Sequence, residues 1–166
     1  MYIRYTMIYL VSENRQLFQS EHYEMISVEK SLEIIQSWDI VQFDTETSGR
    51  DPHVCKVLCA QFGNREAGIQ IVVDTTTTNL LLYKDILETK LIVGHNLKFD
   101  IQFLYQYEII PTKVWDTMII EQLLHLGFDN RFFHYSLQAV ADRRLKIDID
   151  KTTRGEIIWR GLDDQV

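Results

Sequence analysis

Two carboxylates close a strand-like run in the sequence IVQFDTETSG. Asp44 and Glu46 are separated by one residue. Side chains of a strand alternate between faces, so both acids are expected on one face with Cα atoms about 7 Å apart. Ionised carboxylates at this spacing repel each other unless a cation lies between them, and oxygen ligands favour Mg²⁺ or Mn²⁺ over zinc. The pair predicts a metal site, with a solvated strand end as the alternative.

A second stretch, LIVGHNLKFD (91–100), places another acid beside a strand end. The apolar run ends at Gly94, His95 and Asn96 follow in a loop, and Asp100 lies at the start of an expected helix. Loops at strand ends of open α/β sheets are where ligands bind, so Asp100 is expected to complete an oxygen-lined site. The alternatives are a first-turn acid stabilised by the helix dipole for Asp100 and a simple loop residue for Asn96.

Asp148 and Asp150 repeat the spacing of the first pair. Ile147 and Ile149 alternate with them, which favours an exposed strand whose acids are neutralised by nearby bases. Those bases have a second interpretation, contact with substrate phosphates. They are Arg143, Arg144, Lys146 and Lys151.

The composition predicts one domain that does not rely on a basic surface. The chain has 166 residues, 46% of them hydrophobic, and a net charge of -7, whereas proteins that track phosphates are basic. An acidic excess fits a soluble surface or a site for cations. No apolar run reaches 18 residues and the start lacks the order of a signal peptide, so we expect a cytoplasmic protein of a bacterial or phage-infected cell.

The only cysteines, Cys55 and Cys59, lie four residues apart in an apparent strand. Their Cα atoms are then about 13 Å apart, too far for a disulfide. We expect reduced core residues in a reducing compartment. A zinc site with His53 or His95 is the alternative.

Alternating helical and strand-like patterns favour an α/β fold. Ser27 and Ser136 are expected N-caps, and Gly127 an expected helix stop. Short links between three consecutive strands predict an antiparallel meander, and the short apolar run at 91–96 predicts a buried parallel strand. The expected strands are 2–11, 40–46, 56–63, 68–74 and 91–96, and the expected helices are 28–38, 79–90, 97–107, 114–127 and 137–145.

FDTETSG, followed about fifty residues later by VGHNLKFD, resembles the first two motifs of the DEDD 3′–5′ exonucleases, which have a ribonuclease H-like fold. The likeness is greatest to the proofreading domain of DNA polymerase I-type (family A) enzymes and to the RNase D group. It extends through VWDTMIIEQLL, SLQAVADRRL and the spaced Lys151, Arg154 and Trp159, so it covers roughly residues 38–166. The fold implied is a mixed sheet, an antiparallel meander plus parallel strands, with helices packed on it.

The resemblance implies two-metal hydrolysis of phosphodiester bonds, with Mg²⁺ or Mn²⁺ ions about 4 Å apart. The partner implied is a single-stranded DNA 3′ end, with RNA possible and a polymerase domain in the same or another chain. By resemblance, Asp44 and Glu46 hold the first metal, Asp44 also contacts the second, and Asp100 acts on the second through water. The substrate-binding residues implied are Thr47 and Asn96, which contact the terminal nucleotide, and Phe99, which packs behind the site.

The family's fourth acid, in a Tyr-x-x-x-Asp motif, is not found in these 166 residues, because Tyr135 is followed four places on by Ala139. We therefore expect a truncated piece, cut at Val166 before its last catalytic helix. In this interpretation residues 1–166 form one domain with 1–37 as an N-terminal extension. The chain is then expected to bind metal weakly and to hydrolyse DNA very slowly or not at all. The alternatives are an RNase D-like RNA exonuclease and a non-catalytic module that binds nucleic acid or regulates.

Overall fold

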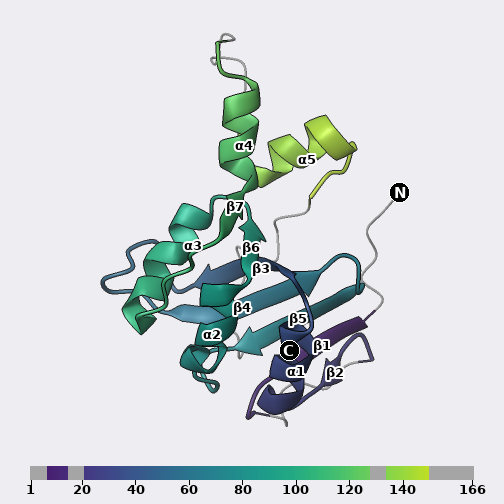
Figure 1. Ribbon diagram of the computed structural model, residues 1–166, viewed down its shortest axis with the longest axis vertical. Helices are drawn as coiled ribbons and strands as arrows, with labels where there is room; N and C mark the ends of the chain where they lie inside the picture. The colour runs from purple at the N-terminus through teal and green to yellow at the C-terminus, as the bar shows by residue number, and fades with distance from the viewer. Residues whose placement is uncertain (1–6, 15–20, 128–133, 150–166) are drawn as a thin grey trace.

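A seven-stranded mixed sheet in the order β2-β1-β5-β4-β3-β6-β7 organises the molecule (Figure 1). The computed structural model describes residues 7–14, 21–127 and 134–149. The elements are β1 (Met7–Val11), β2 (Glu24–Met25), α1 (Val28–Gln36), β3 (Ile40–Thr47), β4 (Val57–Asn64), β5 (Ile69–Asp74), η1 (Leu80–Tyr83), α2 (Lys84–Thr89), β6 (Leu91–Gly94), α3 (Leu97–Leu104), η2 (Tyr105–Tyr107), β7 (Val114–Asp116), α4 (Thr117–Leu124) and α5 (Leu137–Leu145).

The predicted meander is confirmed. β3 pairs antiparallel with β4, and β4 with β5, because the links between them are short. β6 pairs with β3 in the parallel sense, as predicted for the apolar run after α2. Along β3 the side chains of Val41, Phe43 and Thr45 are buried while Asp44 is exposed. The alternation expected from the strand period therefore holds.

The core lies between the sheet and the helices α1, α2 and α3. Phe43 and Phe62 pack with ring centroids 5.3 Å apart, and Phe62 stacks on Tyr83 at 5.0 Å. The Tyr83 hydroxyl reaches Ser31 Oγ of α1 at 2.6 Å, which satisfies a polar group inside the core. Each of these buried aromatic side chains contributes about 1.5–3 kcal/mol through the area that it removes from water.

The predicted caps at Ser27 and Ser136 are confirmed: their side chains accept hydrogen bonds from Lys30 N and Ala139 N. The predicted helix 114–127 is wrong at its start. Val114–Asp116 form β7, which pairs with the free edge of β6, and α4 begins at Thr117. A short apolar run is compatible with the period of a helix and with that of a strand, and here the pairing with the neighbouring strand β6 determines which forms.

Other differences from expectation are local. β2 was not predicted, because a two-residue strand leaves no periodic signal. Cys55 lies in the loop before β4, not in the strand, and both cysteines are free thiols. The expected strand around Asp148 is absent from the described residues 146–149, which are irregular; Asp150 and the first residues of the expected strand 2–11 lie outside the described residues.

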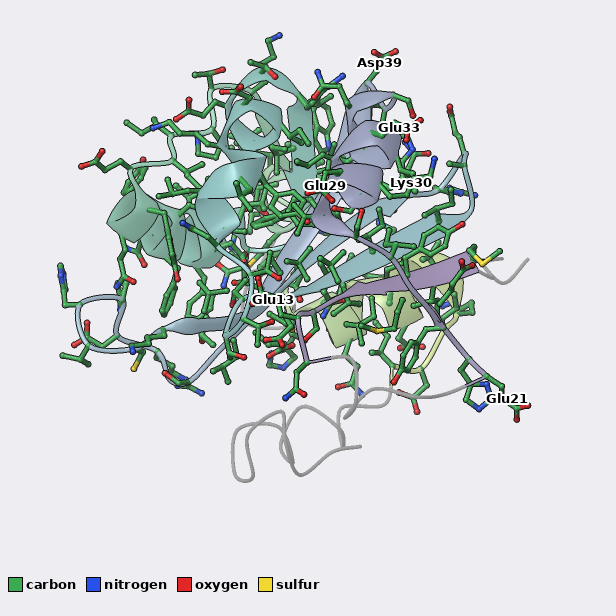
Figure 2. The ribbon with its side chains drawn as sticks, turned by 90° about the horizontal axis from the view of Figure 1, so that it is seen from below. Glu13, Glu21, Glu29, Lys30, Glu33 and Asp39 are labelled. Carbon is green, nitrogen blue, oxygen red and sulfur yellow. The ribbon has the colours of Figure 1, made fainter. Side chains whose placement is uncertain are left out.

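Part of the acidic excess lies on α1, away from β7. Glu29, Lys30 and Glu33 stand on the outer surface of this helix, with Asp39 where the chain turns into β3 (Figure 2). Lys30 and Glu33 form an exposed ion pair at 2.9 Å, which contributes little to stability. Within the described parts of the chain, no helix is long and apolar enough to cross a membrane.

The described parts of the segment 1–37, residues 7–14 and 21–37, share the core with the rest of the chain. β1 pairs in parallel with β5, and Val11 of β1 and Ile35 of α1 are both fully buried. α4 and α5 stand off the β7 end of the sheet, opposite the end that carries α1 and β2 (Figure 1). Two regions are thus distinguished: a layered sheet with α1–α3, and a projecting pair of helices.

Candidate active site

The carboxyl half of β3 presents the first two predicted acids on one face. Asp44 is exposed and Glu46 is half-buried, opposite Gln61 and Cys59 of β4. The ladder shifts register between Glu46 and Thr47, an irregularity of the kind that re-aims side chains near functional sites. Burial raises the pKa of Cys59 to about 12, and the charges of Glu46 and Asp44 add to the shift. Both carboxylates therefore act on the same patch of the sheet.

Asp100 reaches β3 from the first turns of α3. Its Oδ1 accepts hydrogen bonds from Thr45 N at 2.9 Å and from Thr45 Oγ1 at 2.6 Å. β6 pairs with β3 only as far as Gln42, so the Thr45 amide lies beyond the end of the neighbouring strand. Asp100 provides the acceptor that a neighbouring strand would otherwise provide there, and its carboxyl is fixed at Thr45, the residue between Asp44 and Glu46 in the sequence.

Burial raises the pKa of Asp100 to about 7, hydrogen bonds from Thr45 oppose the shift, and the nearby charge of Asp44 adds to it. A buried carboxyl close to a second carboxylate is stable as an anion only where positive charge is supplied. Among the influences on the Asp100 carboxyl there is no positively charged side chain of the described residues; the groups that favour its anion are Thr45 and a backbone hydrogen bond of Asp100 itself. A bound cation would stabilise the two carboxylates Asp44 and Asp100 together.

Gly94 allows the turn after β6 to lie against β3. A Cβ at this position would lie 2.7 Å from the Phe43 carbonyl oxygen and 2.5 Å from Leu97 Cδ2. Backbone cannot yield as a flexible side chain can, so any larger residue pushes the turn away from β3. Gly94 thus sets the distance between the strand that carries Asp44 and the helix that carries Asp100.

Asn96 begins α3 in the left-handed conformation, at φ 65° and ψ 41°. Its side chain makes no capping hydrogen bond and is exposed. Its backbone amide donates to Asp116 Oδ1 at 2.9 Å, and the same oxygen accepts from Met118 N at 2.9 Å. One carboxylate oxygen therefore holds the starts of both α3 and α4.

The adjacent residue pair is tied in the same way. His95 Nδ1 lies 2.9 Å from Thr117 Oγ1, and Thr117 Oγ1 donates to the Gly94 carbonyl at 3.0 Å. His95 Nε2 donates to the Tyr135 carbonyl at 2.8 Å, which connects the turn to the segment before α5. Sequence reasoning related Asp116 and Thr117 to a recurring helix element of the family and assigned Thr45 to the core, but it gave none of the three a part in the site. The Asp-Thr pair ahead of an apolar run was the available signal, an N-cap.

The remaining predicted substrate residues have defined neighbours. Thr47 is buried and its hydroxyl donates to the Gly49 carbonyl at 2.7 Å, so this proton is used inside the β3–β4 loop. Phe99 is half-buried and packs on Phe103 with centroids 5.1 Å apart. Their contacts with a nucleotide stay predictions.

The donor set fits a divalent cation in chemistry, since three carboxylates come from β3 and α3. Within residues 7–14, 21–127 and 134–149, however, no three His, Cys, Asp or Glu side chains are grouped tightly enough to hold one ion. The role of Asp44, Glu46 and Asp100 as joint metal ligands therefore stays a prediction. What the structure places together is Asp100 with Thr45, the residue that separates the two acids in the sequence of β3.

The basic cluster near α5 has an internal partner. Arg143 Nη2 donates to Glu121 Oε2 at 2.9 Å, and Arg144 Nε donates to Glu121 Oε1. The expected neutralisation of Asp148 and Asp150 by nearby bases stays a prediction, because Asp150 and Lys151 lie outside the described residues; the Oδ1 atom of Asp148 accepts a hydrogen bond from Gln138 at 3.2 Å. Two of the four bases predicted to contact phosphates are therefore engaged within the protein.

Comparisons with known proteins agree with this fold. The structure resembles Escherichia coli RNase D (TM-score 0.62, 15% identity, 86% of this chain and 34% of that one). It also resembles Brucella melitensis NrnC with bound Mg²⁺ (TM-score 0.60, 17% identity, 95% and 75%) and bound to pGG (TM-score 0.56, 19% identity, 87% and 63%). These likenesses define a ribonuclease H-like exonuclease fold, as predicted.

Sequence similarity gives the family. A family model described as 3′–5′ exonuclease, of the DNA polymerase A type, matches residues 22–156. DNA polymerase I of Aquifex aeolicus (strain VF5) is 30% identical over 131 residues, which are 75% of this chain and 20% of that polymerase. The chain belongs to this 3′–5′ exonuclease family, and it spans about a fifth of the length of the polymerase that it matches.

Proposed function

We propose that the domain removes nucleotides from the 3′ end of single-stranded DNA by metal-assisted hydrolysis. The observation that supports this proposal is the attachment of Asp100, the acid of the second motif, to Thr45, the residue between Asp44 and Glu46 in the sequence of the first. Family membership supports the reaction class, and the likeness to a DNA polymerase supports DNA as the substrate.

The protein's own residues have distinct tasks in this proposal. Asp44 and Glu46 are the acids through which a cation reaches the site from solvent. Asp100 supplies a buried carboxyl group, which must lose its proton before it can bind an ion. Asn96 and Thr47 orient the terminal nucleotide, and Phe99 forms the wall behind it. Bound Mg²⁺ or Mn²⁺ supplies an activated water and neutralises the departing oxygen.

RNA is the second candidate substrate. The fold likeness to RNase D and to NrnC bound to pGG favours it, while the sequence match favours DNA. Discrimination between RNA and DNA depends on protein groups that contact the 2′-hydroxyl, a hydrogen-bond donor and acceptor that RNA has and DNA lacks. A polymerase domain acting with this one, in the same or another chain, also belongs to the proposal.

The test is incubation of the chain with matched single-stranded DNA and RNA oligonucleotides, labelled at the 5′ end, with Mg²⁺ or Mn²⁺. Stepwise shortening of DNA from the 3′ end is expected. It should be slow, because only three of the four family acids are found in the sequence. Asp44→Ala should reduce it at least about 100-fold, since a metal ligand is removed.

Asp39→Ala is the matched control, because it removes one exposed acid just before the same strand. It should leave the rate within about twofold. Equal rates for the wild type and Asp44→Ala contradict the proposal. So does a lack of shortening of both oligonucleotides with either ion. Preferential shortening of RNA replaces the first candidate with the second.

A further inference from the structure

Two consecutive residues of one strand-end turn are tied to two consecutive residues of another. The His95–Asn96 turn follows β6, and the Asp116–Thr117 turn joins β7 to α4. Asn96 N donates to Asp116 Oδ1, and His95 Nδ1 contacts Thr117 Oγ1, both at 2.9 Å. Since β6 and β7 are parallel neighbours with Gly94 opposite Asp116, their carboxyl ends meet and the two turns lie side by side.

The turn at Asn96 needs such support. A non-glycine residue in the left-handed region costs about 1 kcal/mol or more and persists where surrounding contacts determine it. The side chain of Asn96 makes no hydrogen bond that caps α3. Its backbone conformation is instead held through the amide by Asp116, so the exposed amide side chain remains available for other contacts.

Asp116 is itself committed to this task. It is 9% exposed, and its Oδ1 serves both Asn96 N and Met118 N. Its second oxygen, Oδ2, is buried with no hydrogen-bond partner in the described part of the chain. A buried carboxylate oxygen without a partner is costly. The starts of α3 and α4 offset part of this cost, because helix N-termini favour negative charge.

We propose that Asp116 is a positioning residue that acts through Asn96, holding its side chain in the orientation that contacts the terminal nucleotide of the substrate. This inference rests on the proposed nuclease function. Thr117 assists by fixing His95 and the Gly94 carbonyl, the two groups with which its hydroxyl is hydrogen-bonded. Loss of Asp116 should therefore weaken substrate binding more than it slows the chemical step.

The experiment measures the affinity of a short single-stranded DNA in EDTA by fluorescence anisotropy, and KM and kcat in Mn²⁺. Asp116→Ala should raise Kd and KM about tenfold, the equivalent of one lost hydrogen bond of about 1.4 kcal/mol, with kcat within about threefold. Asp116→Asn keeps an acceptor oxygen for both amides and should restore Kd to within about threefold. In an Asn96→Ala background, Asp116→Ala should change Kd less than twofold.

Ser27→Ala is the control for a merely structural loss. Ser27 caps α1 through Lys30 N, on an element that carries none of the predicted site residues, so its removal should lower the melting temperature and leave Kd unchanged. If Asp116→Ala is folded and binds as the wild type does, the inference is wrong. It is also wrong if the same loss appears in the Asn96→Ala background.

Asp116→Asn covers the case in which Asp116→Ala does not fold. The inference then requires that Asp116→Asn, folded, keeps KM within about threefold, and a larger rise contradicts it. A wild type that cleaves DNA, loses cleavage with Asp44→Ala and keeps its KM with Asp116→Ala retains the proposed function and loses only this inference. If the wild-type protein neither binds nor cleaves single-stranded DNA, both the proposed function and this inference are wrong.

Discussion

The sheet with α1–α3 and the α4–α5 pair differ in their buried side chains, which are mainly apolar in the first region and include the charged Glu121 of α4 in the second. In the first region Ile35, Phe62 and Leu104 are fully buried, and the acids of β3 face outward. In the second, Glu121 is the buried residue of α4 at 5% exposure, while Ile119, Leu123 and Leu126 are exposed. Both regions have regular helices with apolar periodicity, so periodicity does not by itself give the buried face.

Charge pairing sets the inward face of α4. Glu121 accepts hydrogen bonds from Arg143 and Arg144 of α5, and its backbone carbonyl lies 2.8 Å from His125 Nδ1. Burial acts to raise the pKa of Glu121, but the bonds and charges of Arg144 and Arg143 outweigh it and lower the pKa below its ordinary range. The comparison teaches that the layered sheet is stabilised by area removed from water and the helix pair by ionic hydrogen bonds.

The largest expected effect lies in the layered region. Leu104→Ala removes a side chain with 0% exposure from the core beside α3. The free energy of unfolding should fall by about 2–5 kcal/mol, from lost burial and the cavity left behind. Urea denaturation measures it. A loss below about 1 kcal/mol would contradict the assignment of this region as the hydrophobic core.

Glu121→Ala should cause the next largest loss in the free energy of unfolding. It leaves two arginines without their shared acceptor and should cost about 1.5–3 kcal/mol at pH 7, since hydrogen bonds between charged groups are lost. Because the folded pKa of Glu121 is lowered, its contribution is present above its unfolded pKa of about 4.3 and disappears as the pH falls through the folded pKa. Denaturation at pH 7 and near pH 3 checks this, and an equal loss at both values would contradict it.

Asp100→Asn should stabilise the protein. The folded pKa of Asp100 is about 7, above the unfolded value of about 3.9, so deprotonation opposes folding as the pH rises from about 4 to 7. Without divalent ions the variant should be more stable by about 1–3 kcal/mol at pH 8, a gain that shrinks towards pH 4. Thermal denaturation in EDTA at both values measures it. Destabilisation at pH 8 would contradict the electrostatic description of the site.

The smallest effect should come from the outer face of α4. Leu123 is 58% exposed, so Leu123→Ala should change the free energy of unfolding by less than about 0.5 kcal/mol. Leu104→Ala and Leu123→Ala make the same chemical change, so the difference between their effects compares the buried core of the layered region with the exposed face of α4. A loss of about 2 kcal/mol or more for Leu123→Ala would show that this face is covered in solution.

Local rules predicted the parts of the fold that local physics determines. The meander follows from strand period and short links, and the caps follow from Ser27 and Ser136. The shared face of Asp44 and Glu46 follows from alternation along β3. These features need only a few neighbouring residues, so one sequence is enough to predict them.

Features that depend on distant partners were not predictable in the same way. β7 exists because β6 offers an edge to Val114–Asp116. The burial of Glu121 depends on arginines 22 and 23 positions away. Thr45 was assigned to the core from alternation, and it is buried; its bond to Asp100, 55 positions away, is a tertiary fact. The acids of the candidate site were predicted from spacing and resemblance, whereas the contacts of Asp100 and Asp116 with distant residues were not.

We propose that Asp44, Glu46 and Asp100 form one divalent-cation site. Titration of Mn²⁺ into the ¹⁵N-labelled protein tests it most directly, because the paramagnetic ion broadens amide signals near it. Broadening confined at first to residues 44–47 and 96–101, and abolished by Asp44→Ala, is the predicted result. Broadening that begins at the exposed acids of α1, or that persists unchanged in Asp44→Ala, would contradict the account.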